Sequence, residues 1–168
     1  QAALRIERFR RLAGELGLAA LPLERTSAYY LEELSSQAQL LDGALELVRE
    51  LAGTFPLGLI TNGIASVQRR RFAASPITPY FRSIVISEEV GIAKPDPRIF
   101  APALEAVGVS AQDVLFVGDS VTSDMAAARN AGMDFCWINP RGSAVPEGFA
   151  PAYVIASLGE FPKIVKSE

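Results

Sequence analysis

The segment Val114–Asp124 reads VLFVGDSVTSD and joins a short apolar run to two aspartates. The apolar run, which ends at Gly118, is typical of a strand in a parallel sheet. Asp119 stands at the predicted strand end, and Asp124 falls in the first turn of a helix predicted for residues 123–131. The loop between the two aspartates can turn both carboxylates toward one cation. Complementing the helix dipole is the simpler alternative role for Asp124.

The same alternation of strand and helix continues on both sides of this segment. The predicted strands are residues 57–61, 83–87, 114–118, 135–138 and 153–155, of which the first is apolar enough for burial on both faces. The predicted helices are a stretch capped by Asp42, residues 63–74, residues 97–107, residues 123–131 and the C-terminus. Pro102 should kink the helix at 97–107 or delay its start. This alternation predicts an α/β fold with a Rossmann-like parallel sheet and helices on both faces.

The N-terminal part of the sequence has a different character. Helical patterns cover about residues 2–17 and 24–37, and Gly17 and Pro22 separate them. The strand–helix alternation begins only after these two helices. We therefore expect two parts, residues 1–38 and residues 39–168.

Polar residues follow three of the predicted strands, and each set comes directly after an apolar run. The candidate site residues are Thr61, Asn62, Gly63, Lys94, Asp119 and Asp124. Because ligands bind at the carboxyl ends of parallel strands, we expect these residues to share one site. A hydroxyl, an ammonium group and two carboxylates suit a phosphoryl group held beside a divalent cation. Each residue alone is a weak signal, since Thr commonly ends strands and most lysines are solvated.

Composition excludes several other kinds of chemistry. The 168 residues include no histidine and one cysteine, so Ser-His-Asp catalysis, His-ligated zinc and an internal disulfide are excluded. Cys136 lies in a predicted strand and is expected in the core. The run Arg69–Arg71 is expected to be a solvated helix face. Neither a Walker sequence nor Gly-x-Gly-x-x-Gly occurs, so nucleotide binding by those routes is not expected.

Charge and hydropathy limit the expected partners. There are 16 basic and 19 acidic residues, a net charge of −3, which gives no reason to expect nucleic-acid binding. No apolar run approaches the ~18 residues of a membrane span, so no membrane partner is expected. The lack of disulfides fits a cytoplasmic location. The sequence does not set the oligomeric state.

The motifs together resemble those of the haloacid dehalogenase superfamily of hydrolases. Thr61-Asn62-Gly63 resembles the second motif of that superfamily, Lys94 the third, and Gly118-Asp119 with Asp124 the fourth. Residues 85–100 and 136–139 look most like the branch that holds pyrimidine 5′-nucleotidases and related phosphatases.

One family motif is missing. The first motif, Asp-x-Asp-x-Thr, supplies the nucleophile and the general acid in the family, and no Asp-x-Asp occurs in this sequence. By resemblance, residues 1–38 are part of a helical cap, and residues 39–168 are the core without its N-terminal strand. We therefore expect the chain to begin after the catalytic strand.

The resemblance implies a Mg²⁺-dependent phosphatase for a small phosphorylated metabolite, such as a nucleoside 5′-monophosphate, acting through an aspartyl-phosphate. Thr61, Asn62 and Gly63 would hold the phosphoryl group together with Lys94, which would neutralise its charge. Asp119 would ligate Mg²⁺, and Asp124 would hold the water shell of the ion or position Lys94. A dehalogenase and a non-catalytic phosphate-binding module are the alternatives. The order Thr, Lys, Asp along the chain argues against a phospho-acceptor receiver domain.

Overall fold

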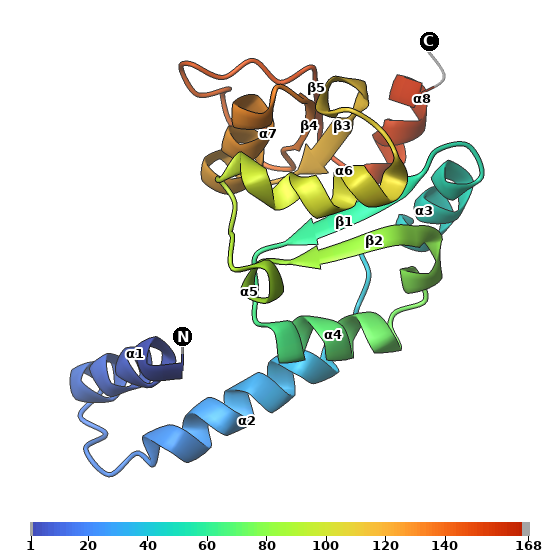
Figure 1. The fold of residues 1–168 in the computed structure, drawn as a ribbon. Coiled ribbons are helices and arrows are strands. Elements are labelled where there is room, and N and C mark those ends of the chain that lie inside the picture. Colours follow the sequence, from blue (N-terminus) through green and yellow to red (C-terminus); the bar gives the residue numbers. More distant parts are fainter. Residues whose placement is uncertain (1, 166–168) are drawn as a thin grey trace.

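The first two helices form a hairpin that projects away from the strands (Figure 1). They are α1 (Ala2–Glu15) and α2 (Leu23–Ser36). Phe9 and Tyr30 pack edge to face between the two helices, with 5.5 Å between the ring centroids. The second helix packs against α4 (Ala65–Ala74), which connects the hairpin to the rest of the molecule.

The computed structural model describes residues 2–165, and its α/β part follows the hairpin. The strands are β1 (Leu57–Thr61), β2 (Phe81–Ile86), β3 (Leu115–Gly118), β4 (Asp134–Ile138) and β5 (Tyr153–Ile155). The other helices are α3 (Ala44–Ala52), α5 (Ser87–Val90), α6 (Ala101–Val107), α7 (Ala126–Ala131) and α8 (Phe161–Val165). Short helical turns are η1 (Thr78–Tyr80), η2 (Pro97–Phe100), η3 (Ala111–Asp113), the π-helical η4 (Val121–Met125) and η5 (Leu158–Glu160).

The strands form two parallel sheets. β1 pairs with β2, while β3, β4 and β5 pair in that order. Within residues 2–165 no ladder joins β1 to β3, so one edge of each strand has no strand partner there. The predicted α/β fold with parallel strands and covering helices is confirmed.

One apolar cluster connects the two sheets. Val85 of β2, Phe100 of η2 and Trp137 of β4 are all buried in this cluster. The rings of Phe100 and Phe116 meet edge to face, with 5.0 Å between their centroids. Phe116 belongs to β3 of the three-stranded sheet, whereas α6 contacts β1 and β2 of the two-stranded sheet. The segment formed by η2 and α6 therefore covers strands of both sheets (Figure 1).

A second cluster lies on the opposite face of β4, because successive strand residues point to opposite faces. Cys136 and Ile155 are buried there together with Phe161 of α8. Leu47 and Leu51 of α3 pack against the same cluster. Helices therefore cover both faces of the three-stranded sheet.

Three local expectations can be compared with the structure. The prediction that Asp42 caps a helix is wrong, because Gly43 adopts a left-handed conformation before α3 and no side chain caps that helix. The strand at 57–61 has the predicted bounds, but it is only half-buried and Gly58 is exposed, because β2 is its one strand neighbour among the described residues. Pro102 does delay its helix, since residues 97–100 form η2 before α6 begins.

Candidate active site

Lys94 reaches both sheets with one buried side chain. Its Nζ atom lies 2.7 Å from Oδ1 of Asp124 and donates to the Ile60 carbonyl oxygen at 3.0 Å. The side chains of Lys94 and Asp124 are only 8% and 9% exposed. The ammonium also lies over the ring of Phe116, 5.4 Å from its centroid. An ammonium has three N–H donors, so one remains beyond these two oxygen partners.

The backbone around Lys94 is held by two asparagines. The Lys94 N–H donates to Oδ1 of Asn62 at 2.9 Å, and Nδ2 of Asn62 donates to the Lys94 carbonyl oxygen, also at 2.9 Å. Asn130 donates from Nδ2 to the Pro95 carbonyl oxygen at 3.2 Å. The Lys94–Pro95 peptide bond is cis. The Asn62 side chain therefore fixes the Lys94 loop. Because that side chain is occupied, the main chain of Asn62 is the candidate phosphate contact.

The two aspartates have different surroundings. Asp124 lies in η4 rather than in a regular helical turn, and its Oδ2 accepts a hydrogen bond from the Ser120 N–H at 3.1 Å. A Cβ atom at Gly118 would lie 2.6 Å from that same oxygen, so the carboxylate needs a glycine beside it. Asp119 is exposed, and its carbonyl oxygen accepts from Nε1 of Trp137 at 3.0 Å.

These carboxylates fit a magnesium site only in part. Both oxygens of Asp124 already have partners, in Lys94 and Ser120, whereas Asp119 presents an exposed carboxylate. Among residues 2–165, no group of three or more His, Cys, Asp or Glu side chains is placed to hold a metal ion. Because Mg²⁺ often takes one or two carboxylates and keeps several waters, Asp119 suits a direct ligand and Asp124 suits a partner of Lys94.

Thr61 and Gly63 both have hydrogen-bond partners at the end of β1. The Thr61 hydroxyl oxygen accepts from Nε2 of Gln68 at 2.7 Å. The Gly63 N–H donates to Oγ of Ser87 at 3.0 Å, so phosphate binding by this N–H would require an exchange of partners. The Ala65 N–H, at the start of α4, donates to a carboxylate oxygen of Glu88 at 2.7 Å.

The structure thus brings Lys94, Asp124 and the end of β1 together, and it adds residues that the sequence did not single out. Gln68 and Ser87 hydrogen-bond Thr61 and Gly63 directly, and Asn130 hydrogen-bonds Pro95, the neighbour of Lys94. Gln68 is the fourth residue of α4, and no motif in the sequence marked it. Of the three arginines, Arg69 and Arg70 are exposed as expected, although Arg69 pairs with Glu89, whereas Arg71 is half-buried and donates to the Gln37 carbonyl oxygen at 2.7 Å.

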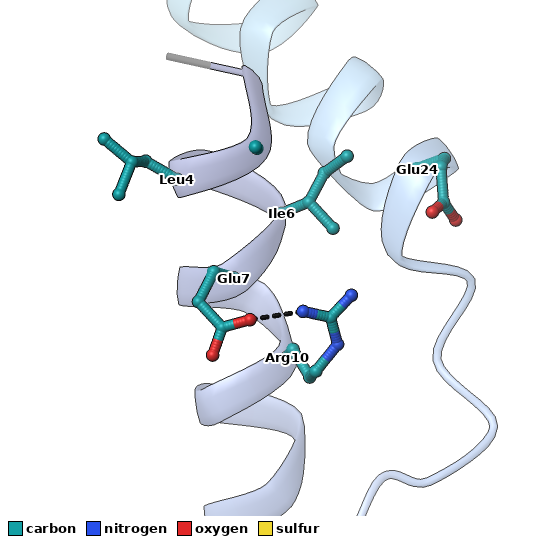
Figure 2. Close-up of a pocket in the computed structure, with 6 residues that line it drawn as sticks. Leu4, Ile6, Glu7, Arg10 and Glu24 are labelled. Carbon is teal, nitrogen blue, oxygen red and sulfur yellow. Dashed lines mark hydrogen bonds and ion pairs between the residues drawn. The ribbon is translucent and has the colours of Figure 1, made fainter.

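Other features lie away from this site. Cys136 is fully buried, as predicted, and burial raises the pKa of its thiol to about 11. A hollow of about 530 Å³ lies on the helical hairpin, and Figure 2 draws the residues that line it. Its lining residues are Ala3, Leu4, Ile6, Glu7, Arg10 and Glu24. Arg10 and Arg11 hydrogen-bond the Glu7 carboxylate and hold its pKa below the usual value. None of the helices in residues 2–165 has the length and apolarity of a membrane span.

Comparison with known families gives one match that covers most of the chain. Residues 6–138 match the family described as haloacid dehalogenase-like hydrolase. The chain is 40% identical over 126 residues to the pyrimidine 5′-nucleotidase YjjG of Escherichia coli (strain K12), which covers 74% of this chain and 56% of that protein. It is 37% identical over 165 residues to the hydrolase YfnB of Bacillus subtilis (strain 168), covering 96% of this chain and 68% of YfnB.

Solved structures agree with these sequence matches. A crystal structure of Bacillus subtilis YfnB bound to magnesium has a TM-score of 0.88 at 32% identity, covering 97% of this chain and 72% of that chain. A 2-haloacid dehalogenase from Pseudomonas syringae pv. Tomato has a TM-score of 0.74 at 31% identity, covering 99% and 71%. The present chain therefore spans little more than half the length of YjjG and about two thirds of YfnB.

Proposed function

Because this chain belongs to the haloacid dehalogenase-like hydrolase family, we propose that it forms part of a Mg²⁺-dependent phosphatase that hydrolyses a small phosphorylated metabolite. The observation that carries the proposal is the buried ion pair between Lys94 and Asp124, which holds an ammonium group against the carbonyl of Ile60. Thr61 is the next residue along β1. An ammonium with a spare N–H donor, held at a strand end that carries a threonine, suits the oxygens of a phosphoryl group.

In this proposal, the Thr61 hydroxyl and the Asn62 main chain bind phosphoryl oxygens, and Lys94 neutralises their charge. An aspartate outside the 168 residues attacks phosphorus, the bond from phosphorus to the leaving oxygen breaks, and water then hydrolyses the aspartyl-phosphate. Asp124 positions Lys94 through their ion pair, and Gly63 keeps the end of β1 free of a side chain. Asp119 would be the protein ligand of Mg²⁺, which supplies charge neutralisation when bound.

We further propose that residues 1–38 are part of a cap and residues 39–168 the core. The separate hairpin of α1 and α2 supports this division, because α2 meets the α/β part at α4. Nucleoside 5′-monophosphates are the first substrates to test, because YjjG and the Streptococcus pneumoniae protein PynA, at 40% and 35% identity, are both named pyrimidine 5′-nucleotidases.

A dehalogenase is the second candidate, because the Pseudomonas syringae dehalogenase has a similar structure. That reaction does not need a metal, so the exposed carboxylate of Asp119 at the end of β3 favours the phosphatase. The third candidate is a non-catalytic phosphate-binding module, which would use the same lysine and threonine without a nucleophile.

The proposal is tested on the complete protein that carries this chain. Purified protein is assayed for phosphate release from nucleoside 5′-monophosphates and sugar phosphates with and without Mg²⁺, and for halide release from 2-haloacids. We expect Mg²⁺-dependent phosphate release, and Lys94→Ala should lower kcat by roughly 10²–10³ because it removes one preorganised charge-stabilising group. Lys163→Ala, on α8, is the matched control with unchanged kcat. Halide release without phosphate release would instead establish the dehalogenase.

Two further variants separate the roles of the aspartates. Asp119→Asn should abolish Mg²⁺-dependent turnover and weaken Mg²⁺ binding measured by calorimetry, because it removes the proposed direct ligand. Asp124→Asn should reduce turnover with a smaller effect on Mg²⁺ affinity, because its main partner is Lys94. Unchanged Mg²⁺ affinity in Asp119→Asn would contradict the metal assignment. The 168-residue chain alone should release no phosphate, since it contains no Asp-x-Asp motif.

A further inference from the structure

The Thr61 hydroxyl is held by a side chain that the family motifs do not include. Gln68 extends from α4 to the end of β1, where its Nε2 lies 2.7 Å from Oγ1 of Thr61. The Gln68 side chain also passes over Gly63, since a Cβ atom at Gly63 would lie 2.9 Å from both Cγ and Nε2 of Gln68. The glycine at position 63 therefore leaves room for this contact.

A neighbouring arginine sets the orientation of the Gln68 amide. Nη1 of Arg71 lies 3.5 Å from Oε1 of Gln68 and donates to it. A guanidinium group has donors but no acceptors, so the oxygen of the amide must face Arg71 and the NH₂ group must face Thr61. Nε of Arg71 donates to the Gln37 carbonyl oxygen at 2.7 Å, which anchors the arginine at the end of α2.

The direction of the hydrogen bond between Gln68 and Thr61 has a chemical consequence. A threonine hydroxyl has one hydrogen and two acceptor lone pairs. Because the Gln68 NH₂ group can only donate, the Thr61 oxygen accepts that bond and its own hydrogen stays available for another acceptor. A phosphoryl oxygen is an acceptor without hydrogens of its own, so it needs this donor.

We propose that Gln68 is a positioning residue that keeps the Thr61 hydroxyl as a hydrogen-bond donor toward the phosphoryl group of the substrate. The proposal rests on the proposed function, because it assumes that Thr61 binds phosphoryl oxygen. Gln68 itself need not touch the substrate. Its effect on turnover is exerted through the direction of one hydroxyl group.

The test uses the opposite hydrogen-bonding character of glutamate. Gln68→Glu keeps the shape and places a carboxylate beside Arg71, but a carboxylate accepts the hydroxyl hydrogen of Thr61 and removes it from the phosphoryl group. Gln68→Met removes the hydrogen bond with little change in volume and leaves the hydroxyl free to rotate. Gln112→Glu, an exposed position in η3, is the control for the same charge change.

Steady-state kinetics of the complete protein should rank the variants. Thr61→Val and Gln68→Glu should each lower kcat by about 10- to 100-fold, the loss expected for one hydrogen bond to a charged group. Gln68→Met should lower kcat by less than Gln68→Glu, and Gln112→Glu should not change it. Gln68→Glu should have no further effect in the Thr61→Val background, because the hydroxyl is already absent.

Any other result contradicts either the role of Gln68 or the phosphoryl-binding role of Thr61. If Thr61→Val lowers kcat but Gln68→Glu does not, the role of Gln68 is wrong while the proposed function stands. A larger loss in Gln68→Met than in Gln68→Glu would show that the direction of this hydrogen bond does not set turnover and would also overturn the positioning role of Gln68. If the parent protein releases no phosphate, or if Thr61→Val is fully active, the phosphoryl-binding role of Thr61 fails and the inference fails with it. Thermal melts confirm that each variant is folded.

Discussion

The candidate site residues follow strands of both sheets, but the two sheets are supported very differently. In the three-stranded sheet, Phe135, Cys136 and Trp137 of β4 are all buried, and helices cover both faces. In the two-stranded sheet, β1 is half-buried with an exposed Gly58. The carboxylates Asp119 and Asp124 follow the well-supported sheet, whereas Thr61 ends the weakly supported one.

The difference shows why Lys94 matters to the structure as well as to the proposed chemistry. Its side chain donates to the Ile60 carbonyl oxygen of β1 and pairs with Asp124, which follows β3. Together with the cover formed by η2 and α6, this polar contact connects strands for which no ladder is present between residues 2 and 165. The dependence of the two sheets on this connection can be measured with variants.

The largest effect on stability is expected from breaking the ion pair. Lys94→Met leaves the Asp124 carboxylate buried without its charge partner, which should lower the free energy of unfolding by about 3–5 kcal/mol. Adding Asp124→Asn to this variant should recover part of the loss, with a coupling of about 0.5–3 kcal/mol. Urea unfolding of the four proteins in the cycle measures both values.

The matched control is Arg69→Met, which breaks the exposed ion pair with Glu89. Water solvates those charges, so the free energy of unfolding should change much less than in Lys94→Met. Equal losses in the two variants would show that burial of the Lys94–Asp124 pair has no special importance for the connection between the sheets.

A glycine in each sheet allows a second comparison. Gly118→Ala, at the end of β3, places a Cβ atom 2.6 Å from Oδ2 of Asp124 and should cost about 1–3 kcal/mol through overpacking. Gly58→Ala, in β1, places a Cβ atom 3.6 Å from that of Ala103, an ordinary contact. It should stabilise the protein by about 0.5–1 kcal/mol, since glycine weakens a strand interior. Thermal melts that show the same sign for both variants would contradict this difference between the sheets.

Cys136 reports on the three-stranded sheet alone. The thiol is buried and its pKa is raised to about 11, so at pH 8 it should react with a thiol reagent only after unfolding. The neutral thiol is favoured in the folded state, so stability is full below the ordinary thiol pKa near 8.5 and falls as the pH rises toward 11. Labelling rates with and without urea measure this protection, and Cys136→Ala should remove the contribution of the thiol to the alkaline loss. Rapid labelling of the folded protein would show that this sheet opens readily.

The sequence predicted the strands well because each is a short apolar run. It also predicted that Lys94 and Asp124 lie near the end of β1, because polar residues follow those runs. The resemblance left two roles open for Asp124, holding the water shell of Mg²⁺ or positioning Lys94. Its contact with Lys94 depends on side-chain directions in η4 that spacing does not contain. The contacts of Gln68 and Arg71 were not predicted, because no motif marks Gln68 and a run of arginines on a helix is usually solvated. The prediction that Asp42 caps a helix was wrong because the adjacent Gly43 precedes α3 in a left-handed conformation, and no side chain caps that helix.

The smallest expected effect concerns the segment that covers both sheets. Asp96 caps η2 by accepting a hydrogen bond from the Arg98 N–H at 3.0 Å, and the Arg98 side chain hydrogen-bonds the same carboxylate. These bonds lower the pKa of Asp96 to about 2. The stabilisation is therefore present above the ordinary carboxyl pKa near 3.9 and is lost as the pH falls toward 2. Asp96→Asn should slightly lower the melting temperature at pH 7, and the difference from the parent should shrink between pH 4 and pH 2. Asp42→Asn, at an exposed aspartate without a cap bond, should leave the melting temperature unchanged. A pH-independent difference for Asp96→Asn would show that the ionised carboxylate does not stabilise this cover, which would leave apolar packing of η2 and α6 as its support.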